Sequence, residues 1–162
     1  MFTNNFCKGS LLFLLCLPGL VMAGLQSFTS ESLEEITAAR SGQPFLLVLW
    51  SIDCPPCLKE LKHIGQLYSQ FTPGSLVLVS TDGADYADEA QQILTQNGLA
   101  NAESWLFSGG FPERLRYRID PNWYGELPRA YFYDASHERA GKSGALSIEL
   151  LKQFIAGSKH IE

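Results

Sequence analysis

The chain has 162 residues, a formal net charge of −5 and a pI near 5.2. This length suits one domain with one hydrophobic core. The mild acidic excess gives no support for binding to nucleic acid or to an anionic membrane surface, so neither is expected among the partners.

The N-terminus has the layout of a secretory signal peptide. Met1–Ser10 carries one basic residue and no acidic one, and the apolar segment Leu11–Met22 follows it before Ala23. This order predicts cleavage after Ala23, which leaves residues 24–162 as a mature domain that is periplasmic or secreted. The alternative is an uncleaved membrane anchor. The apolar segment is short for a span of about 20 residues and contains Pro18-Gly19, which disfavours an anchor.

Cleavage at this point also changes the cysteine count. Cys7 and Cys16 belong to the signal segment, so the mature chain keeps only Cys54 and Cys57. A bridge between residues this close closes a very short loop and has little effect on the entropy of the unfolded chain. The pair is therefore better explained by reactivity than by stability.

The predicted elements alternate between helix and strand. Ser32-Leu33-Glu34-Glu35 has the pattern of a capping box and predicts a helix that ends near Gly42. Phe45–Trp50 is a continuous apolar run, typical of a central strand covered on both faces. The elements expected after it are a helix over Cys57–Phe71, a strand over Ser75–Thr81, a helix over Asp85–Asn97, a strand over Ser104–Phe107, a short helix or irregular segment over Phe111–Arg118, strands over Arg129–Asp134 and Glu138–Ser143, and a helix over Ser147–Gly157. This order predicts an α/β domain, a central mixed β-sheet flanked by helices with an antiparallel hairpin at one edge.

The sequence Cys54-Pro55-Pro56-Cys57 lies between the predicted central strand and the helix that follows it. The first turn of a helix offers free N–H donors and a positive partial charge, and both stabilise a thiolate on the first cysteine. The thiolate is the attacking species in disulfide exchange. Spacing and position therefore predict a redox-active dithiol.

The order of strand, Trp50, Cys-Pro-Pro-Cys, helix, strand and helix, followed by Gly125-Glu126-Leu127-Pro128 before another strand, resembles the thioredoxin fold. Within that fold, the chain resembles the secreted TlpA-like thiol-disulfide oxidoreductases. The resemblance covers about residues 30–158. It implies a thioredoxin-like domain over residues 24–162 with a redox-active Cys54–Cys57 disulfide.

The resemblance also implies roles for individual residues. Cys54 is the nucleophile and Cys57 the resolving cysteine, while Glu60 matches an acid common in this subfamily and is the candidate for proton transfer. The bond before Pro128 is expected to be cis, and the backbone just before it to hold an extended substrate chain. The residues expected to bind substrate are Trp50, Pro55, Pro56, Leu127 and Pro128. The run Trp123-Tyr124-Gly125 is a further candidate to contact partners.

Some residues depart from the family pattern. Asp53 precedes Cys54 where the family usually has an aromatic residue, and a carboxylate there opposes the thiolate and favours a reducing protein. If Arg129 lies near the dithiol, it acts in the opposite direction, so the sequence leaves the sum of the two effects open. Val48 stands where classical thioredoxins carry a buried acid, which makes Glu60 the better candidate for proton transfer.

Metal sites and other variants of the fold fit these residues less well. Zinc needs two further ligands, and the chain has no second cysteine pair and no His-x-x-x-His sequence. Copper carriers of this fold need a wider cysteine spacing and a nearby histidine, and a peroxide-reducing relative needs proline where Leu47 stands. We therefore expect no metal and no cofactor.

The expected function is reduction of protein disulfides. Candidate substrates are apocytochrome c and other periplasmic redox proteins, and a membrane thiol electron donor of the DsbD type is expected to restore the dithiol. Two alternatives stay open. One is a disulfide-donating oxidase of the same fold, and the other is a non-catalytic binding module whose disulfide is static.

Overall fold

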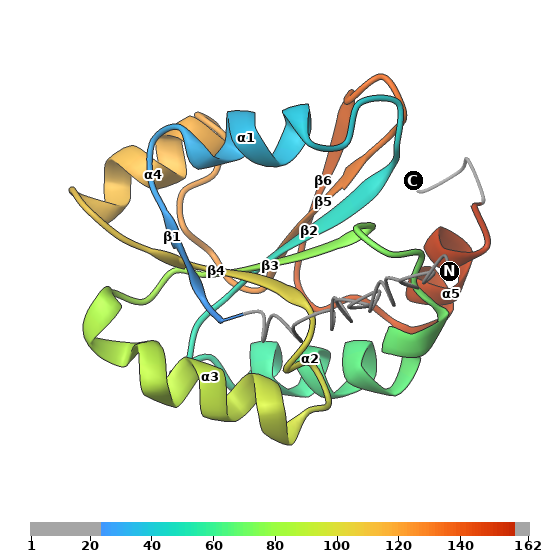
Figure 1. Cartoon of the computed structure of the whole chain (residues 1–162), viewed down its shortest axis with the longest axis horizontal. Helices are drawn as coiled ribbons and strands as arrows, with labels where there is room; N and C mark the ends of the chain where they lie inside the picture. Colours follow the sequence, from blue (N-terminus) through green and yellow to red (C-terminus); the bar gives the residue numbers. More distant parts are fainter. Residues whose placement is uncertain (1–23, 158–162) are drawn as a thin grey trace, which may run out of the picture.

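A computed structural model describes residues 24–157, which form a six-stranded sheet with helices on both faces (Figure 1). The expected signal peptide, with Cys7 and Cys16, lies outside the described residues. The strands are β1 (Gln26–Phe28), β2 (Phe45–Trp50), β3 (Leu76–Ser80), β4 (Glu103–Phe107), β5 (Arg129–Tyr133) and β6 (Arg139–Ser143), in the spatial order β1-β4-β3-β2-β5-β6. The first four pair in parallel, and β5 and β6 are antiparallel to their neighbours. The predicted α/β domain with a central mixed sheet is confirmed.

The helices cover the sheet in two layers. They are α1 (Ser32–Ala38), α2 (Pro55–Leu67), α3 (Ala87–Gln96), α4 (Pro112–Ile119) and α5 (Ile148–Ile155), with short 3₁₀ turns at Tyr68–Gln70 and Ala84–Tyr86. Figure 1 shows α1 and α4 on one face and α2 and α3 on the other, with α5 beside the end of α2. No helix within residues 24–157 has both the length and the apolarity needed to cross a membrane.

Strand β2 explains how one apolar run supplies two cores. Every residue of β2 is buried. Because successive side chains of a strand point to opposite faces, Leu46, Val48 and Trp50 enter the core that includes α2, while Leu47 and Leu49 enter the core under α1 and α4. The unbroken hydrophobicity that predicted a central strand therefore reflects burial on both sides.

The start of α1 differs from the prediction. The Ser32 side chain does not cap the helix, because its hydroxyl accepts a hydrogen bond from the Thr29 N–H at 2.9 Å and lies 3.3 Å from the Ser27 carbonyl. The helix begins at Ser32 and ends at Ala38, and its cap position is Glu31, whose side chain makes no capping hydrogen bond to the helix. The predicted capping box is wrong because the hydroxyl binds the preceding segment instead.

Other helix and strand boundaries also differ from the prediction. Strand β1 was not predicted, since only Phe28 of its three residues is buried and no alternation can be read from so short a segment. Helix α2 begins at Pro55, two residues before Cys57, because a first-turn proline lacks only an N–H that would have no partner inside the helix. The ambiguous segment at 111–118 is helical from Pro112.

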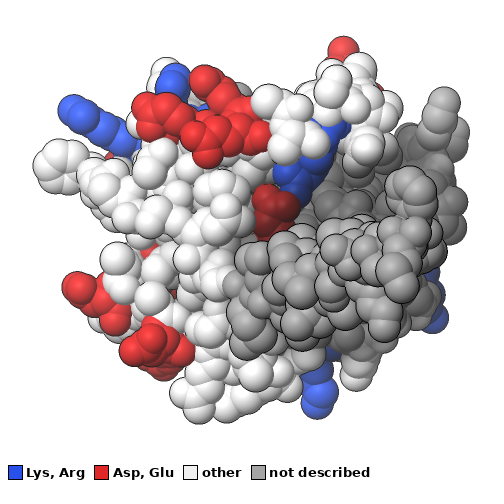
Figure 2. Space-filling model, viewed as in Figure 1, with Lys and Arg blue, Asp and Glu red and all other residues white. Residues whose placement is uncertain are grey.

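Acidic groups are unevenly spread over the surface. On the face seen in Figure 2, they gather over α1, whose first turn carries Glu34 and Glu35, and over the start of α3, where Asp85, Asp88 and Glu89 lie. This distribution agrees with the acidic composition of the chain.

Candidate active site

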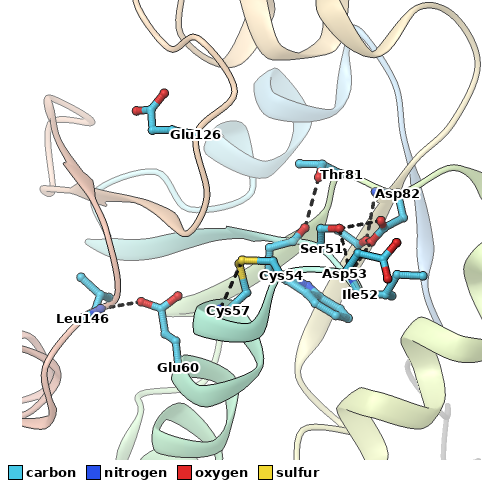
Figure 3. Close-up of a disulfide and its surroundings, with 12 residues drawn as sticks. Ser51, Ile52, Asp53, Cys54, Cys57, Glu60, Thr81, Asp82, Glu126 and Leu146 are labelled. Atoms are coloured by element: carbon cyan, nitrogen blue, oxygen red, sulfur yellow. Dashed lines mark hydrogen bonds between the residues drawn. A yellow bond between two sulfur atoms is a disulfide. The ribbon is translucent and has the colours of Figure 1, made fainter.

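The two cysteines lie where the connection that follows β2 enters α2. They form a disulfide, with Cys54 at the cap position of the helix and Cys57 in its first turn (Figure 3). The Cys57 N–H donates a hydrogen bond to the Cys54 sulfur at 3.3 Å. Cys54 is half-buried and Cys57 is fully buried. The helix therefore directs an N–H donor at the more accessible sulfur, the arrangement that stabilises a thiolate there once the bond is reduced.

The turn that precedes Cys54 is held by a residue that the sequence analysis missed. The Asp82 carboxylate, just after β3, accepts hydrogen bonds from the Ser51 hydroxyl at 2.8 Å and the Ile52 N–H at 3.0 Å. The turn is closed by the Cys54 N–H, which donates to the Ser51 carbonyl at 3.2 Å. The available signal was a carboxylate directly after the predicted strand that neighbours β2, because parallel strands end at the same edge of the sheet.

Glu60 lies one turn beyond Cys57 on α2 and is 1% exposed. Its Oε1 accepts a hydrogen bond from the Leu146 N–H at 2.7 Å, in the loop before α5, and its Oε2 has no partner among residues 24–157 (Figure 3). Burial raises the pKa of Glu60 to about 7, although the Leu146 N–H acts in the opposite direction. A carboxyl group that titrates near neutral pH is suited to accept and return protons.

The Leu127–Pro128 peptide bond is cis, which confirms the expectation from the resemblance. Strand β5 begins just after it and pairs with β2, with Ala130 opposite Val48, so the start of β5 lies beside the end of β2 that leads to the cysteines. Among residues 24–157, the backbone N–H and carbonyl of Leu127 have no hydrogen-bond partner. These unpaired groups lie just before β5, an inner strand of the sheet, and an extended peptide could pair with them.

Arg129 does not lie near the dithiol, where it could have favoured the Cys54 thiolate. Its guanidinium binds the Ser143 hydroxyl at 2.7 Å and the carboxylates of Asp120 and Glu126 at 3.3 and 3.4 Å, and it lies over the Tyr131 ring. Arg129 and Tyr131 point to the α1 and α4 side of the sheet, whereas α2 carries the disulfide on the other side. Arg129 therefore does not offset the exposed carboxylate of Asp53.

The remaining predicted contact residues divide by exposure. Pro55 and Pro56 are exposed, and Leu127 is half-buried. Trp50 is fully buried, which leaves its ring no free surface for a partner, and it belongs to the same core as Cys57. Trp123 is also buried and donates from its indole to the Glu126 carbonyl at 2.9 Å, whereas the neighbouring Tyr124 is 93% exposed.

Comparisons with known proteins show which fold this is. No protein-family model matches the chain, and no curated protein matches it. Similar solved structures include a secreted Mycobacterium tuberculosis disulfide oxidoreductase homologous to E. coli DsbE (19% identity, TM-score 0.55, 74% of this chain and 85% of that one), a DsbF homologue from Corynebacterium diphtheriae (17%, 0.59, 74% and 74%) and a thioredoxin-family thiol:disulfide interchange protein from Chlorobium tepidum (16%, 0.60, 75% and 83%). The chain has the thioredoxin fold, and the solved structures it resembles are described as thiol-disulfide oxidoreductases and their homologues.

Proposed function

We propose that this protein is a thiol-disulfide oxidoreductase that acts on protein substrates. The observation that carries the proposal is the Cys54–Cys57 disulfide at the start of α2, at the end of the sheet where the unpaired backbone of Leu127 precedes the cis proline. A reactive sulfur beside the unpaired backbone of Leu127 fits an extended polypeptide that carries a disulfide. The descriptions of the structurally similar proteins support the same class of reaction.

The reaction begins from the reduced dithiol. The Cys54 thiolate attacks one sulfur of the substrate disulfide, which forms a mixed disulfide and releases the other substrate sulfur as a thiolate that takes up a proton. Cys57 then loses its proton and attacks the Cys54 sulfur. The second substrate sulfur leaves and is protonated, so two electrons have passed to the substrate and the Cys54–Cys57 disulfide has formed.

Glu60 is the proposed proton acceptor for the second step. Cys57 is fully buried, so its proton needs an acceptor inside the protein, and Glu60 lies one turn along the same helix. Its carboxyl group, with one oxygen unpartnered among residues 24–157, has a pKa raised to about 7 by burial and can take up that proton near neutral pH.

The proposed direction is reduction of the substrate, in the periplasm or outside the cell. The exposed carboxylate of Asp53 beside Cys54 favours this direction, because its negative charge disfavours the Cys54 thiolate and therefore the reduced form of the cysteine pair. A compartment that is oxidising then requires a membrane thiol donor of the DsbD type to regenerate the dithiol, and apocytochrome c is a candidate substrate. The proposal includes cleavage of the signal peptide after Ala23.

A disulfide-donating oxidase is the second candidate. The N–H of Cys57 on the Cys54 sulfur favours the thiolate, and stabilising the reduced form makes the disulfide a stronger oxidant. A static disulfide in a binding module is less consistent with the half-buried position of Cys54.

The redox equilibrium of the cysteine pair tests the proposal and its direction. Residues 24–162 are titrated in dithiothreitol and glutathione buffers, and we expect a potential near the reducing end of the span from about −270 to −120 mV covered by thioredoxin-fold proteins. A potential at the oxidising end would assign the oxidase, and the absence of any titration would leave the static module. Cys54→Ser should abolish insulin reduction, whereas Cys57→Ala should accumulate mixed disulfides.

A further inference from the structure

The connection between β2 and α2 has few backbone hydrogen bonds of its own. Ile52 is almost fully buried, so its N–H group needs a partner. Within residues 24–157, the only partner of that N–H is the Asp82 carboxylate, and the same carboxylate accepts from the Ser51 hydroxyl. The conformation of the turn 51–53 therefore depends on a side chain that comes from a different strand connection.

Asp82 is itself fixed from beneath. The hydroxyl of Ser80, which is fully buried at the end of β3, donates to Asp82 Oδ2 at 2.5 Å, and the Asp82 N–H donates back to that hydroxyl at 3.2 Å. The neighbouring Thr81 N–H donates to the Trp50 carbonyl at 2.9 Å, and the Thr81 hydroxyl donates to the same carbonyl at 3.3 Å (Figure 3), which ties the same two segments together. The carboxylate is thus held at one position rather than free to turn toward solvent.

The turn 51–53 sets the position of Cys54, the proposed nucleophile. The Ser51 carbonyl accepts from the Cys54 N–H, and its hydroxyl oxygen lies 3.4 Å from the Asp53 nitrogen. Cys54 is the cap residue of α2, so a rotation of the turn would move its sulfur away from the Cys57 N–H. A displacement of the sulfur by about 1 Å would be enough to slow the reaction substantially, since a misplacement of that size can cost about a hundredfold in rate.

We infer that Asp82 is a positioning residue for the proposed thiol-disulfide exchange, which holds the turn 51–53 so that the Cys54 sulfur stays over the first N–H groups of α2. This inference rests on the proposed function. It assigns Asp82 two opposing effects on Cys54. Its negative charge disfavours the thiolate, whereas the geometry it enforces favours the thiolate through the helix N-terminus.

Two substitutions separate these effects. Asp82→Asn removes the charge but keeps an oxygen that accepts from the Ile52 N–H and the Ser80 hydroxyl, and it places an amide group that can donate to the Ser51 hydroxyl. Asp82→Ala removes the charge and all of the contacts. Asp85→Ala is the matched control, because Asp85 is an exposed acid three residues further along with no side-chain hydrogen bond or ion pair among residues 24–157.

The measurements are the pH dependence of Cys54 alkylation in the reduced protein and kcat/KM for reduction of a small aromatic disulfide. We expect the pH midpoint of Cys54 alkylation to be higher in Asp82→Ala than in Asp82→Asn. We also expect the kcat/KM of Asp82→Ala to be at least about tenfold below that of Asp82→Asn and of the wild type, while Asp85→Ala matches the wild type in both measurements. Equal profiles and rates for Asp82→Ala and Asp82→Asn would overturn the positioning role and leave only an effect of charge. A wild-type kcat/KM for Asp82→Ala would overturn the inference altogether.

Two further points keep the test decisive. If Asp82→Ala fails to fold, Ser51→Ala removes one of the contacts and is expected to lower kcat/KM severalfold, and no change in that variant would count against the inference. If the wild type itself exchanges no disulfide, the proposed function fails rather than the role of Asp82.

Discussion

At the scale of single residues, Glu60 makes the stability of the protein depend on pH between its ordinary and its folded-state pKa. Its folded-state pKa, raised to about 7 by burial, lies above the ordinary value of 4.5. Between these two values the folded state binds a proton that the unfolded state does not. The stabilisation linked to this proton is present below about pH 4.5 and is lost as the pH rises through about 7.

We expect Glu60→Gln to remove this dependence. Glutamine keeps an acceptor for the Leu146 N–H and carries no charge into the core. Between pH 5 and pH 8, the wild type should lose about 2 kcal/mol of unfolding free energy more than the variant does. Urea unfolding of the oxidised protein at the two pH values measures this, with the exposed Glu89→Gln as the control. Parallel pH curves for wild type and Glu60→Gln would contradict the burial of an ionisable carboxyl.

At the scale of elements, the segment that joins α4 to β5 presents an exposed aromatic ring at Tyr124, in the same connection as the cis proline. Its conformation is anchored by the buried Trp123, which binds the Glu126 carbonyl, and by Gly125, whose φ of +97° suits only glycine without strain. A Cβ at Gly125 would also lie 3.2 Å from Arg116. Tyr124 is therefore an exposed side chain on a well-anchored loop, and tyrosine is a frequent anchor in protein interfaces.

Removal of the Tyr124 ring should affect protein substrates only. We expect Tyr124→Ala to lower kcat/KM for insulin reduction about threefold to tenfold, in the range of an interface anchor, and to leave both the reduction of a small disulfide and the redox potential unchanged. Tyr117→Ala, which removes a comparably exposed ring on α4, serves as the control. Equal losses for the small disulfide and for insulin would show that the loop supports the dithiol rather than the substrate.

At the scale of the whole molecule, a charged cluster joins segments that are distant in the sequence. Asp120, at the end of α4, accepts from the Tyr131 hydroxyl at 2.9 Å and pairs with Arg129 and Arg139 at 3.3 and 3.4 Å. Burial by itself raises the pKa of Asp120, but the Asn122 N–H, the Tyr131 hydroxyl and the two arginines outweigh it, and the pKa is lowered. The stabilisation from this carboxylate is present above its ordinary pKa and is lost as the pH falls through the lower folded value.

We expect Asp120→Ala to lower the free energy of unfolding by about 2 kcal/mol, because it leaves two partly buried arginines without their shared carboxylate. The loss should be largest at neutral pH and should shrink in acid, where the wild type also loses the charge. The redox potential should stay at the wild-type value, since this cluster lies on the face of the sheet away from α2. A clear shift in potential would instead couple the cluster to the dithiol.

Features that depend on neighbours along the chain could be predicted from the amino-acid pattern. The apolar run Phe45–Trp50 predicted a central strand, and Cys54-Pro55-Pro56-Cys57 before an amphipathic segment predicted a dithiol at a helix start. These predictions succeeded because alternation, helix periodicity and cysteine spacing act over a few residues. The resemblance added the cis bond before Pro128, which spacing alone could not show.

The groups that meet across the fold became evident from the three-dimensional arrangement of the elements. It placed Asp82 under the turn before Cys54 and the Leu146 N–H on Glu60, and it turned Arg129 to the far face of the sheet. It also showed that the Ser32 hydroxyl binds the preceding segment instead of capping a helix. Each of these outcomes depends on strand register and on competition among hydrogen-bond partners, which the local pattern of side chains does not fix.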